Sequence, residues 1–302
     1  MTTVVITTYK RPADIVKRAI MSIVNQTLKE WELIVVDDSP ASFEGREEVK
    51  NTVLSFASKH NVRYIAHEKN IGACAARNTG LAAAKGEYIA YLDDDDEWDP
   101  RKLELQLSLF EKGGDDLALV YCSCYLQISD LTGKKSVVEL GKHRGDVISE
   151  IMKRNFAGGA SNPMISVRCA RAVNGFDVEM RAAQDYDFWS RLAEKYKFDY
   201  VEEPLIIYHL QNDACISSNP QNRIAGMERL MKKHEKYLKK HPEAYYMRGI
   251  MICRDYARGG KRIEAFKMWC KCIFIKPLWL KSNGRTLLSI IRNGWFPGKR
   301  YY

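Results

Sequence analysis

The sequence lacks the long hydrophobic runs that span membranes: no stretch of 18 or more uncharged apolar residues occurs in its 302 residues. It also lacks a signal-peptide pattern, and its eight cysteines include no pair at CxxC spacing. A spanning helix, a secreted disulfide framework and a zinc site are therefore not predicted. We expect reduced thiols in a cytoplasmic protein, and attachment to a membrane surface stays open.

Acidic residues are scarce in the last part of the chain. Residues 220–302 contain 20 Lys and Arg against 5 Asp and Glu, whereas residues 1–219 contain 27 against 33. The net charge of +9 therefore comes from the C-terminal part. This asymmetry indicates a body with a separate module that meets something anionic, or a solvated helical face. We predict a first domain over 1–219 and a basic helical extension over 220–302.

Strands and helices alternate in the first half of the chain. Four apolar runs that do not alternate with polar residues predict buried strands at 3–7, 33–36, 62–66 and 88–92. Helical patterns follow them at about 12–25, 43–59, 72–84 and 99–110. The pattern predicts an α/β fold with a parallel sheet covered on both faces.

The rest of the chain departs from this pattern. Residues 113–219 read as mixed α+β, with a strand at 117–125, a turn at 131–134, a helix at 184–196 and a short strand at 205–208. From about residue 220 amphipathic helices follow at 227–240 and 243–272, with a turn at Gly259 and Gly260. The first domain thus divides into halves over 1–112 and 113–219.

Five consecutive carboxylates, from Asp93 to Glu97, follow the fourth predicted strand. Carboxylates this close repel one another by about 1 kcal/mol or more at partial burial, so such a cluster favours a divalent cation or basic partners. The cluster lies at the carboxyl end of a strand, where open α/β sheets bind ligands. The alternative is a solvated acidic loop that caps the next helix.

Two further polar segments end predicted strands at the same edge, residues 7–11 and 37–39. Tyr9 can stack on a base, Asp38 can accept from a ring N–H or a ribose hydroxyl, and Arg77 can neutralise a phosphate. Residues 7–11 contain no glycine, which disfavours the phosphate loop of a sugar-phosphate nucleotidylyltransferase. Each residue alone is weak evidence, but their order along the chain is specific.

Several separated motifs resemble the family 2 glycosyltransferases of GT-A fold, in order and approximate spacing. They are ITTYKRP at 6–12, NQT at 25–27 before WELIVVDDS at 31–39, NIG at 70–72, ARNTG at 76–80 and GEYIAYLDDDDEW at 86–98. The resemblance covers residues 1 to about 218. It implies a Rossmann-like, mostly parallel sheet with a mixed acceptor half, and an inverting, metal-dependent transfer of a sugar from a nucleotide-sugar donor, with a UDP-sugar expected.

The resemblance also implies which residues hold the donor. Thr8, Tyr9 and Asp38 correspond to the residues that bind the nucleoside. Arg77 corresponds to an arginine beside the donor, and we assign Arg11 to donor binding with it. Residues 1–112 are then the nucleotide-sugar-binding half of the catalytic domain.

The acid cluster contains the DxD element that this family uses for a metal ion. Asp93, Asp94 and Asp95 match it, and Asp95 is the expected direct ligand, with Asp93 as the second metal candidate. Asp93 and Asp94 are also expected to hold ribose, sugar hydroxyls or coordinating water. Mg²⁺ or Mn²⁺ suits such a site, because a hard cation takes oxygen ligands and offsets charge on the departing diphosphate. Asp96 and Glu97 are expected to support these residues or to start the next helix.

Inversion requires a base that deprotonates the acceptor hydroxyl. The segment AQDYDFW at 183–189 resembles the family segment that carries this base, which makes Asp185 the catalytic candidate, with Asp187 as its competitor. Gln184 stands where Glu is common, which removes a neighbouring charge. Both acids would fit equally well as caps of the next helix.

Two other segments bear on the acceptor half. A His often occurs in the family at the place of Gln211, whereas here His209 lies two residues earlier, so a metal or diphosphate role for a His is in doubt. Residues 158–161 are small and are expected to line the acceptor side, although a plain turn also explains them.

The resemblance alone implies a glycosyltransferase that builds a capsule, O-antigen or exopolysaccharide on a lipid-linked or growing glycan acceptor. The C-terminal extension interleaves lysines with aromatics, which fits peripheral contact with anionic lipid on the inner face of the membrane or packing against the catalytic domain. Specific nucleic-acid binding is not predicted. A nucleotidylyltransferase and a non-catalytic nucleotide-sugar binder are the alternatives.

Overall fold

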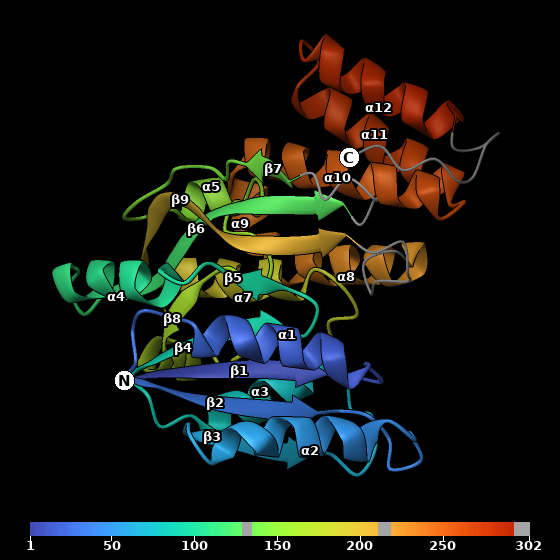
Figure 1. Ribbon diagram of the computed structural model, residues 1–302. Coiled ribbons are helices and arrows are strands. Elements are labelled where there is room, and N and C mark those ends of the chain that lie inside the picture. The colour runs from blue at the N-terminus through green and yellow to red at the C-terminus, as the bar shows by residue number, and fades with distance from the viewer. Residues whose placement is uncertain (129–134, 211–218, 293–302) are drawn as a thin grey trace. The chain divides into compact units, whose positions relative to one another are not determined.

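The computed structural model describes residues 1–128, 135–210 and 219–292. Within these ranges one nine-stranded sheet has the order β3-β2-β1-β4-β8-β6-β9-β5, with β7 paired to β6 (Figure 1). The chain divides into two compact units. The first unit comprises residues 1–148, 156–178 and 188–212, and the second comprises 149–155, 179–187 and 213–302.

Four parallel strands form the N-terminal part of the sheet: β1 (Thr2–Thr8), β2 (Trp31–Asp37), β3 (Val62–Ala66) and β4 (Tyr88–Asp93). The helices between them are α1 (Ala13–Val24), α2 (Arg46–Ala57) and α3 (Ala73–Ala83). Figure 1 shows α1 and α2 on one face and α3 on the other, as right-handed crossovers require when the strand order reverses. The prediction of a parallel sheet with two covered faces is confirmed.

The register of these strands aligns their polar ends. Thr8 pairs with Asp37 between β1 and β2, and Thr7 pairs with Asp93 between β1 and β4. Strand order reverses at β1, because β2 and β4 lie on its two sides. The segment after β1 and the acid cluster after β4 therefore share the position where open α/β sheets bind ligands.

The remaining strands make the sheet mixed: β5 (Glu97–Trp98), β6 (Leu117–Ile128), β7 (Lys135–Val138), β8 (Met164–Ser166) and β9 (Lys197–Leu210). The helices of this half are α4 (Lys102–Lys112), α5 (Ile148–Ile151), α6 (Val167–Ala172) and α7 (Gln184–Ala193). β8 is antiparallel to β4 and β6, whereas β6 and β9 are parallel.

Two predicted elements need correction here, and a third is not tested. The short strand expected at 205–208 is part of the 14-residue β9, because its long parallel pairing with β6 begins at Lys197. The helix expected from residue 99 begins at Lys102, since residues 97–98 form β5. The expected turn at 131–134 lies outside the described residues, and the strands on either side of it, β6 and β7, pair antiparallel as a hairpin.

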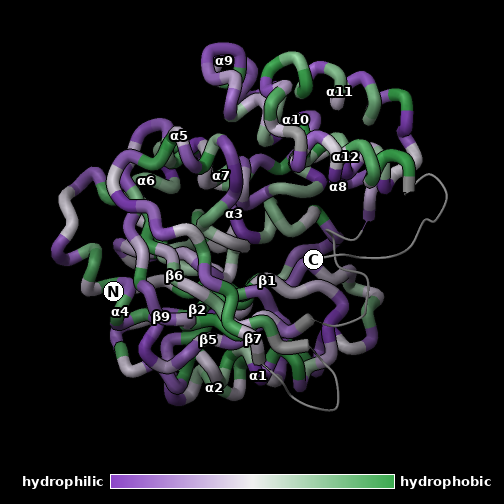
Figure 2. Tube along the Cα trace, turned by 90° about the horizontal axis from the view of Figure 1, so that it is seen from above, coloured by the Kyte–Doolittle hydropathy of each residue, from purple (hydrophilic) through white to green (hydrophobic). Residues whose placement is uncertain are grey.

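Five helices form the described C-terminal part: α8 (Pro220–Lys233), α9 (Glu235–Lys240), α10 (Pro242–Arg258), α11 (Arg262–Ile275) and α12 (Leu280–Arg292). The single helix expected at 227–240 is wrong, because it is interrupted at His234. The expected turn at Gly259 and Gly260 is confirmed, and the positive φ of Gly260 (78°) shows why glycine suits it. Figure 2 shows hydrophilic and hydrophobic residues alternating along α11.

The second unit includes two segments from the predicted catalytic domain, 149–155 and 179–187. Composition placed a boundary after residue 219, whereas the main part of this unit begins at residue 213. None of the helices in the described ranges is long and apolar enough to cross a bilayer.

Candidate active site

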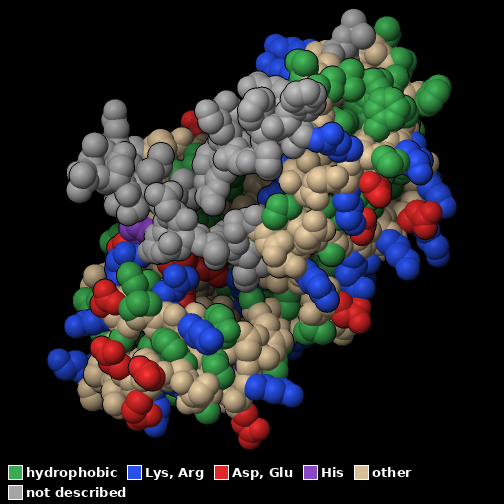
Figure 3. Space-filling view, turned by 90° about the vertical axis from the view of Figure 1, so that its right-hand side faces the viewer, with side chains coloured by type: hydrophobic (Ala, Val, Ile, Leu, Met, Phe, Trp, Pro, Cys, Tyr) green, Lys and Arg blue, Asp and Glu red, His purple; other side chains and the backbone are tan. Residues whose placement is uncertain are grey.

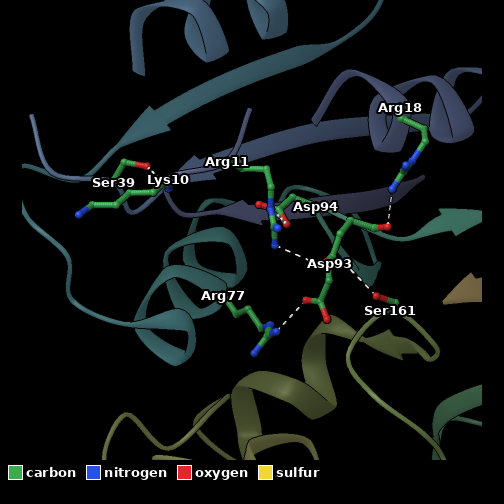
Figure 4. A network of polar contacts seen from close by, with 9 residues as sticks. Lys10, Arg11, Arg18, Ser39, Arg77, Asp93, Asp94 and Ser161 are labelled. Atoms are coloured by element: carbon green, nitrogen blue, oxygen red, sulfur yellow. Dashed lines mark hydrogen bonds and ion pairs between the residues drawn. The ribbon is translucent and has the colours of Figure 1, made fainter. Parts of the chain in front are cut away.

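Arg11 connects the segment after β1 to the acid cluster. Its Nε donates to Asp94 Oδ1 at 2.9 Å, and its Nη2 donates to Asp95 Oδ2 at 3.1 Å (Figure 4). The Arg11 side chain is 30% exposed, as is that of Asp95, whereas the Asp94 side chain is only 6% exposed. One guanidinium thus holds a buried and an accessible carboxylate.

The environment of Asp94 differs from that of its neighbours. Burial raises the pKa of Asp94 to about 6, although the Arg11 charge opposes the shift. Burial and the nearby Asp93 charge also raise the pKa of Asp95. The surroundings of Asp94 and Asp95 therefore disfavour their ionised forms, and a bound cation would stabilise those forms.

Arg77 holds the first acid of the cluster from the other side. Its Nη2 donates to Asp93 Oδ1 at 2.7 Å, and its guanidinium lies over the Phe176 ring, 5.3 Å from the centroid. The Arg77 side chain is 9% exposed, whereas that of Asp93 is 37% exposed. Figure 4 shows Asp93 directed toward Arg77 and Asp94 directed toward Arg11.

Ser161 fixes the backbone at the start of the acid cluster. Its hydroxyl accepts from the Asp93 N–H at 3.0 Å and donates to Asp96 Oδ2 at 2.6 Å. Its carbonyl accepts from the Trp98 indole at 2.9 Å. Asp96 is 5% exposed, and burial, with the Asp93 and Asp95 charges, raises its pKa well above the usual value. Asp96 is therefore a buried residue that supports the cluster through Ser161, which agrees with the expectation that it supports Asp93 to Asp95.

Glu97 also belongs to the polar network and does not start the next helix. It lies on β5, where its carboxylate pairs with Arg18 at 3.3 Å and with His209 Nε2 at 2.7 Å. Arg18 also donates to the Asp95 carbonyl at 2.7 Å. Burial and the Arg18 charge lower the pKa of His209. The structure thus places His209 beside the acid cluster, and Gln211 lies outside the described residues.

Asp38 organises the loop before α3. Its carboxylate accepts from the backbone N–H groups of Ile71 and Gly72 at 2.9 and 2.8 Å, and it contacts His67 Nδ1 at 2.8 Å. Asp38 is 3% exposed, and its own N–H donates to the Thr8 carbonyl at 2.9 Å. Its nucleoside-binding role stays a prediction.

Tyr9 is accessible in the same region. Its ring is 46% exposed, and Lys10 Nζ lies 5.5 Å from the ring centroid. Lys10 has φ 49°, a left-handed conformation that is uncommon for a residue other than glycine, and its N–H donates to Ser39 Oγ at 2.8 Å. This strained turn presents an exposed aromatic ring just after β1, where a nucleobase could stack.

The acids of the cluster differ in their suitability for a metal ion. The described residues contain no group of three or more His, Cys, Asp or Glu placed to hold one. Asp93 and Asp95 are the exposed carboxylates, whereas Asp94 and Asp96 are buried against Arg11 and Ser161. This donor set fits Mg²⁺ or Mn²⁺ bound by one or two carboxylates, with phosphate or water oxygens as the other ligands.

The base candidate Asp185 lies in the second unit, in the first turn of α7. Asp185 is half-buried, whereas Asp187 is fully buried and its carboxylate pairs with Lys233 of α8 at 2.6 Å. A buried ion-paired carboxylate cannot readily reach a substrate hydroxyl. The structure therefore favours Asp185 over Asp187, and the role itself stays a prediction.

The C-terminal helices hold the segment that carries Asp185. Arg248 of α10 is fully buried and donates through Nε to the Met152 carbonyl at 2.7 Å and to the Tyr186 hydroxyl at 3.2 Å. Gly226 of α8 lies so close that an added Cβ would be 2.3 Å from the Ala182 carbonyl oxygen. Ala183, next to it, has φ 55°. This backbone strain just before α7 is sustained by the packing around it.

Sequence reasoning missed several supporting residues. Arg18, His67, Lys233 and Arg248 each contact a predicted site residue or its neighbour from a separate element. Ser161 was expected only to line the acceptor side. No local signal marks these residues, because their partners become adjacent only through strand register and helix packing.

The mixed sheet, with an arginine-bound acid turn at its reversal point, has the GT-A fold of the S. aureus TarS structures. The family model described as "Glycosyl transferase family 2" matches residues 3–159. The chain is 30% identical to the "Putative colanic acid biosynthesis glycosyl transferase WcaA" of Escherichia coli, over 72% of this chain and 76% of that protein. The chain therefore belongs to glycosyltransferase family 2.

Two other similarities agree with this assignment. The "Putative teichuronic acid biosynthesis glycosyltransferase TuaG" of Bacillus subtilis is 37% identical, over 71% of this chain and 81% of that protein. The crystal structure of S. aureus TarS 1-349 in complex with UDP-GlcNAc matches with a TM-score of 0.66 at 14% identity, covering 97% of this chain and 89% of that one. The chain spans 54% of a longer TarS structure. The prediction of a glycosyltransferase is thus confirmed over its two alternatives, a nucleotidylyltransferase and a non-catalytic nucleotide-sugar binder.

Proposed function

We propose that this glycosyltransferase transfers a sugar, with inversion, from a UDP-sugar to a hydroxyl of a lipid-linked or growing glycan during polysaccharide synthesis. The observation that supports the donor site is the meeting of Arg11 and Arg77 with the acid cluster at the β1–β4 reversal point, with the exposed ring of Tyr9 at the end of β1. The relatives named for colanic and teichuronic acid synthesis, and the UDP-GlcNAc complex of TarS, support the substrate classes.

The paired charges explain how the donor site receives a diphosphate. Arg11 and Arg77 currently neutralise Asp93, Asp94 and Asp95. A diphosphate and a divalent cation form a matched pair of opposite charges, so the arginines can turn to phosphate oxygens while the accessible acids turn to the cation. The exchange conserves the charge balance of the site, which lowers the cost of taking a charged donor out of water.

Asp95, with Asp93, would hold Mg²⁺ or Mn²⁺, which supplies charge stabilisation for the departing diphosphate. The exposed ring of Tyr9 offers a face on which the nucleobase of the donor can stack. Thr8 and Asp38 fix the loops near Tyr9. These residues bind and orient the donor, and none of them is assigned a proton-transfer step.

Asp185 is the base in this proposal. A half-buried carboxylate can accept the proton of the acceptor hydroxyl as its oxygen attacks the anomeric carbon, opposite the leaving diphosphate. Gln184 donates to the Met180 carbonyl at 3.0 Å and adds no charge beside Asp185. A cytoplasmic location, with peripheral membrane contact through residues 220–302, completes the proposal and is supported by the basicity of that segment.

A thermal-shift panel of nucleotide sugars, with and without Mn²⁺, tests the proposed donor class. We expect UDP-sugars to raise the melting temperature, and Mn²⁺ to enlarge the shift. Free sugar phosphates with nucleoside triphosphates serve as the control, because they are nucleotidylyltransferase substrates. Stabilisation by that control alone would contradict the proposal.

A further inference from the structure

Large apolar side chains are exposed over the last two described helices and the turn between them. Of the exposed large hydrophobic residues within the described ranges, half lie at residues 263–291. Phe274 and Leu278 are each 87% exposed, and Ile263 is 68% exposed. The others are Phe266, Trp279, Leu288 and Ile291. Such a concentration marks an interaction surface, because scattered single residues are the ordinary case.

The exposed side chains follow the helical repeat. Ile263, Phe266 and Phe274 lie on one face of α11, at spacings of three and eleven residues, and Leu288 and Ile291 are three residues apart on α12. The opposite faces carry buried Ala265 and Cys272 on α11 and Asn283, Thr286 and Ile290 on α12. Both helices therefore pack through one face and present exposed apolar side chains on the other.

Basic residues border this apolar surface. Residues 262–292 contain seven Lys and Arg and one acidic residue, Glu264. Lys267, Lys271, Lys281 and Arg285 are all exposed on α11 and α12. Figure 3 shows hydrophobic side chains gathered at the upper right, over the C-terminal helices, with Lys and Arg side chains beside them. This charge pattern is complementary to an anionic surface.

A cavity of about 410 Å³ opens beside this apolar surface. It is lined by Arg254 of α10 and by Leu278, Trp279, Lys281, Ser282 and Arg285. Three cationic side chains, a hydroxyl and an aromatic ring suit a phosphate group attached to an apolar chain. The cavity thus joins the basic and apolar features of the surface.

Buried polar contacts fix the turn that carries Leu278 and Trp279. Asn283 accepts from the Tyr246 hydroxyl at 2.8 Å and donates to the Lys276 carbonyl at 3.0 Å. The Trp269 indole donates to the Asn283 carbonyl at 3.0 Å, and the Trp279 ring packs edge-on against Tyr246 with centroids 5.0 Å apart. The exposed apolar residues are therefore held in place, which lowers the entropy lost on binding.

We propose that residues 262–292, called here the α11–α12 hairpin, are the membrane-binding element and dock on an anionic lipid bilayer. Phe274, Leu278 and Trp279 enter the interfacial region, and the cavity beside them takes a lipid headgroup phosphate. Basic residues around the apolar surface supply the electrostatic part of the binding free energy, and burial of the inserted apolar side chains supplies the hydrophobic part. This inference deepens the proposed peripheral contact but does not depend on the assigned catalytic residues.

Vesicle sedimentation of the full chain tests the docking. We expect binding to phosphatidylcholine vesicles containing one quarter phosphatidylglycerol, and at least tenfold weaker binding to pure phosphatidylcholine. The double variant Phe274→Ser/Leu278→Ser should bind the anionic vesicles at least tenfold more weakly than the wild type, and so should Lys281→Glu/Arg285→Glu. Leu54→Ser is the matched control, because Leu54 is 43% exposed on α2 of the first unit and should leave vesicle binding unchanged.

Two results would overturn the docking proposal. One is equal binding of the wild type to both vesicle types, or unchanged binding by both double variants. The other is a concentration-dependent oligomer in sedimentation velocity that Phe274→Ser/Leu278→Ser abolishes, which would assign the surface to a second copy. Donor thermal shifts measured on the same variants separate this failure from failure of the glycosyltransferase proposal.

Discussion

The acid cluster and the segment that carries Asp185 are supported in different ways. Arginines from the first 80 residues hold the acid cluster, and one of them, Arg11, directly follows the strand next to it. Helices α8 and α10 hold the Asp185 segment, through Lys233 and Arg248, which follow it in sequence by tens of residues. The arginines of the donor site thus come from the N-terminal part of the chain, with Ser161 as a later support, whereas the base segment depends on the C-terminal helices.

The C-terminal extension therefore has a structural role in addition to its proposed contact with the membrane. Composition indicated a separate basic module, yet segments 149–155 and 179–187 belong to the same compact unit as α8 to α12. The extension therefore supports the predicted base segment through α8 and α10 and exposes its basic, apolar surface on α11 and α12. A truncation after residue 219 would remove both, so single substitutions are the sharper tests.

The largest expected effect separates chemistry from binding. Asp185→Asn should lower the transfer rate by about 10²–10⁴-fold, the usual contribution of a positioned general base, while the donor dissociation constant stays unchanged. Single-turnover transfer and donor titration measure the two quantities. A comparable loss of transfer rate and of donor affinity would show that Asp185 is not the base and that its segment also takes part in donor binding.

The Lys233–Asp187 ion pair tests the dependence of the base segment on α8. Lys233→Met should lower the free energy of unfolding by about 3 kcal/mol, because it leaves the buried Asp187 carboxylate without this cation. Lys232→Met, at the exposed neighbouring position, is the matched control and should have little effect. Urea unfolding measures both, and equal stabilities would show that the pair does not support this segment.

A pair of glycine substitutions tests the packing of α8 on residue 182. Gly226→Ala should destabilise by about 1–3 kcal/mol, because the new Cβ would collide with the Ala182 carbonyl. Gly284→Ala on α12 meets nothing within 4 Å, so it should stabilise by about 1 kcal/mol through helix propensity. Thermal unfolding compares them. Stabilisation by both would mean that α8 does not constrain the base segment.

The smallest effect concerns the core below the acid cluster. Lys102 is fully buried, with Nζ 2.8 Å from Gln106 Oε1 and 4.0 Å from the Trp98 ring centroid, and burial lowers its pKa to about 7. The unfolded chain therefore binds the proton more tightly between pH 7 and 10, so folding stability rises with pH in that window.

Lys102→Met should remove this pH dependence. Between pH 7 and 9 the free energy of unfolding of the wild type should rise by about 1 kcal/mol per pH unit more than that of the variant. Urea unfolding at several pH values measures both. Lys112→Met, exposed at the end of α4, should keep the wild-type slope. Identical slopes for all three proteins would refute a deprotonating buried lysine.

The two regions also differ in how far the sequence predicts them. Unalternating apolar strands and the polar residues after them predicted that Thr8, Asp38 and Asp93 lie at one edge, because parallel strands end together. The sequence did not distinguish buried Asp94 from accessible Asp95, since their exposure depends on the turn after β4 and on Arg11.

The Asp185 segment was less predictable. Asp185 and Asp187 look equivalent in sequence, whereas the structure separates them by the full burial of Asp187 and its pairing with Lys233. The supports of this segment come from α8 and α10, whose packing no local pattern indicates. The left-handed conformation of Ala183 is likewise invisible in sequence, because alanine rarely adopts it.

The most direct test of the account is calorimetric titration of UDP into the wild type and Asp95→Asn, each with and without Mn²⁺. We predict that Mn²⁺ tightens UDP binding to the wild type by at least tenfold and that Asp95→Asn loses this tightening while weak metal-free binding remains. Wild-type affinity that is unaffected by Mn²⁺, or tightening that survives in Asp95→Asn, would contradict the assignment of the acid cluster as a metal-dependent donor site.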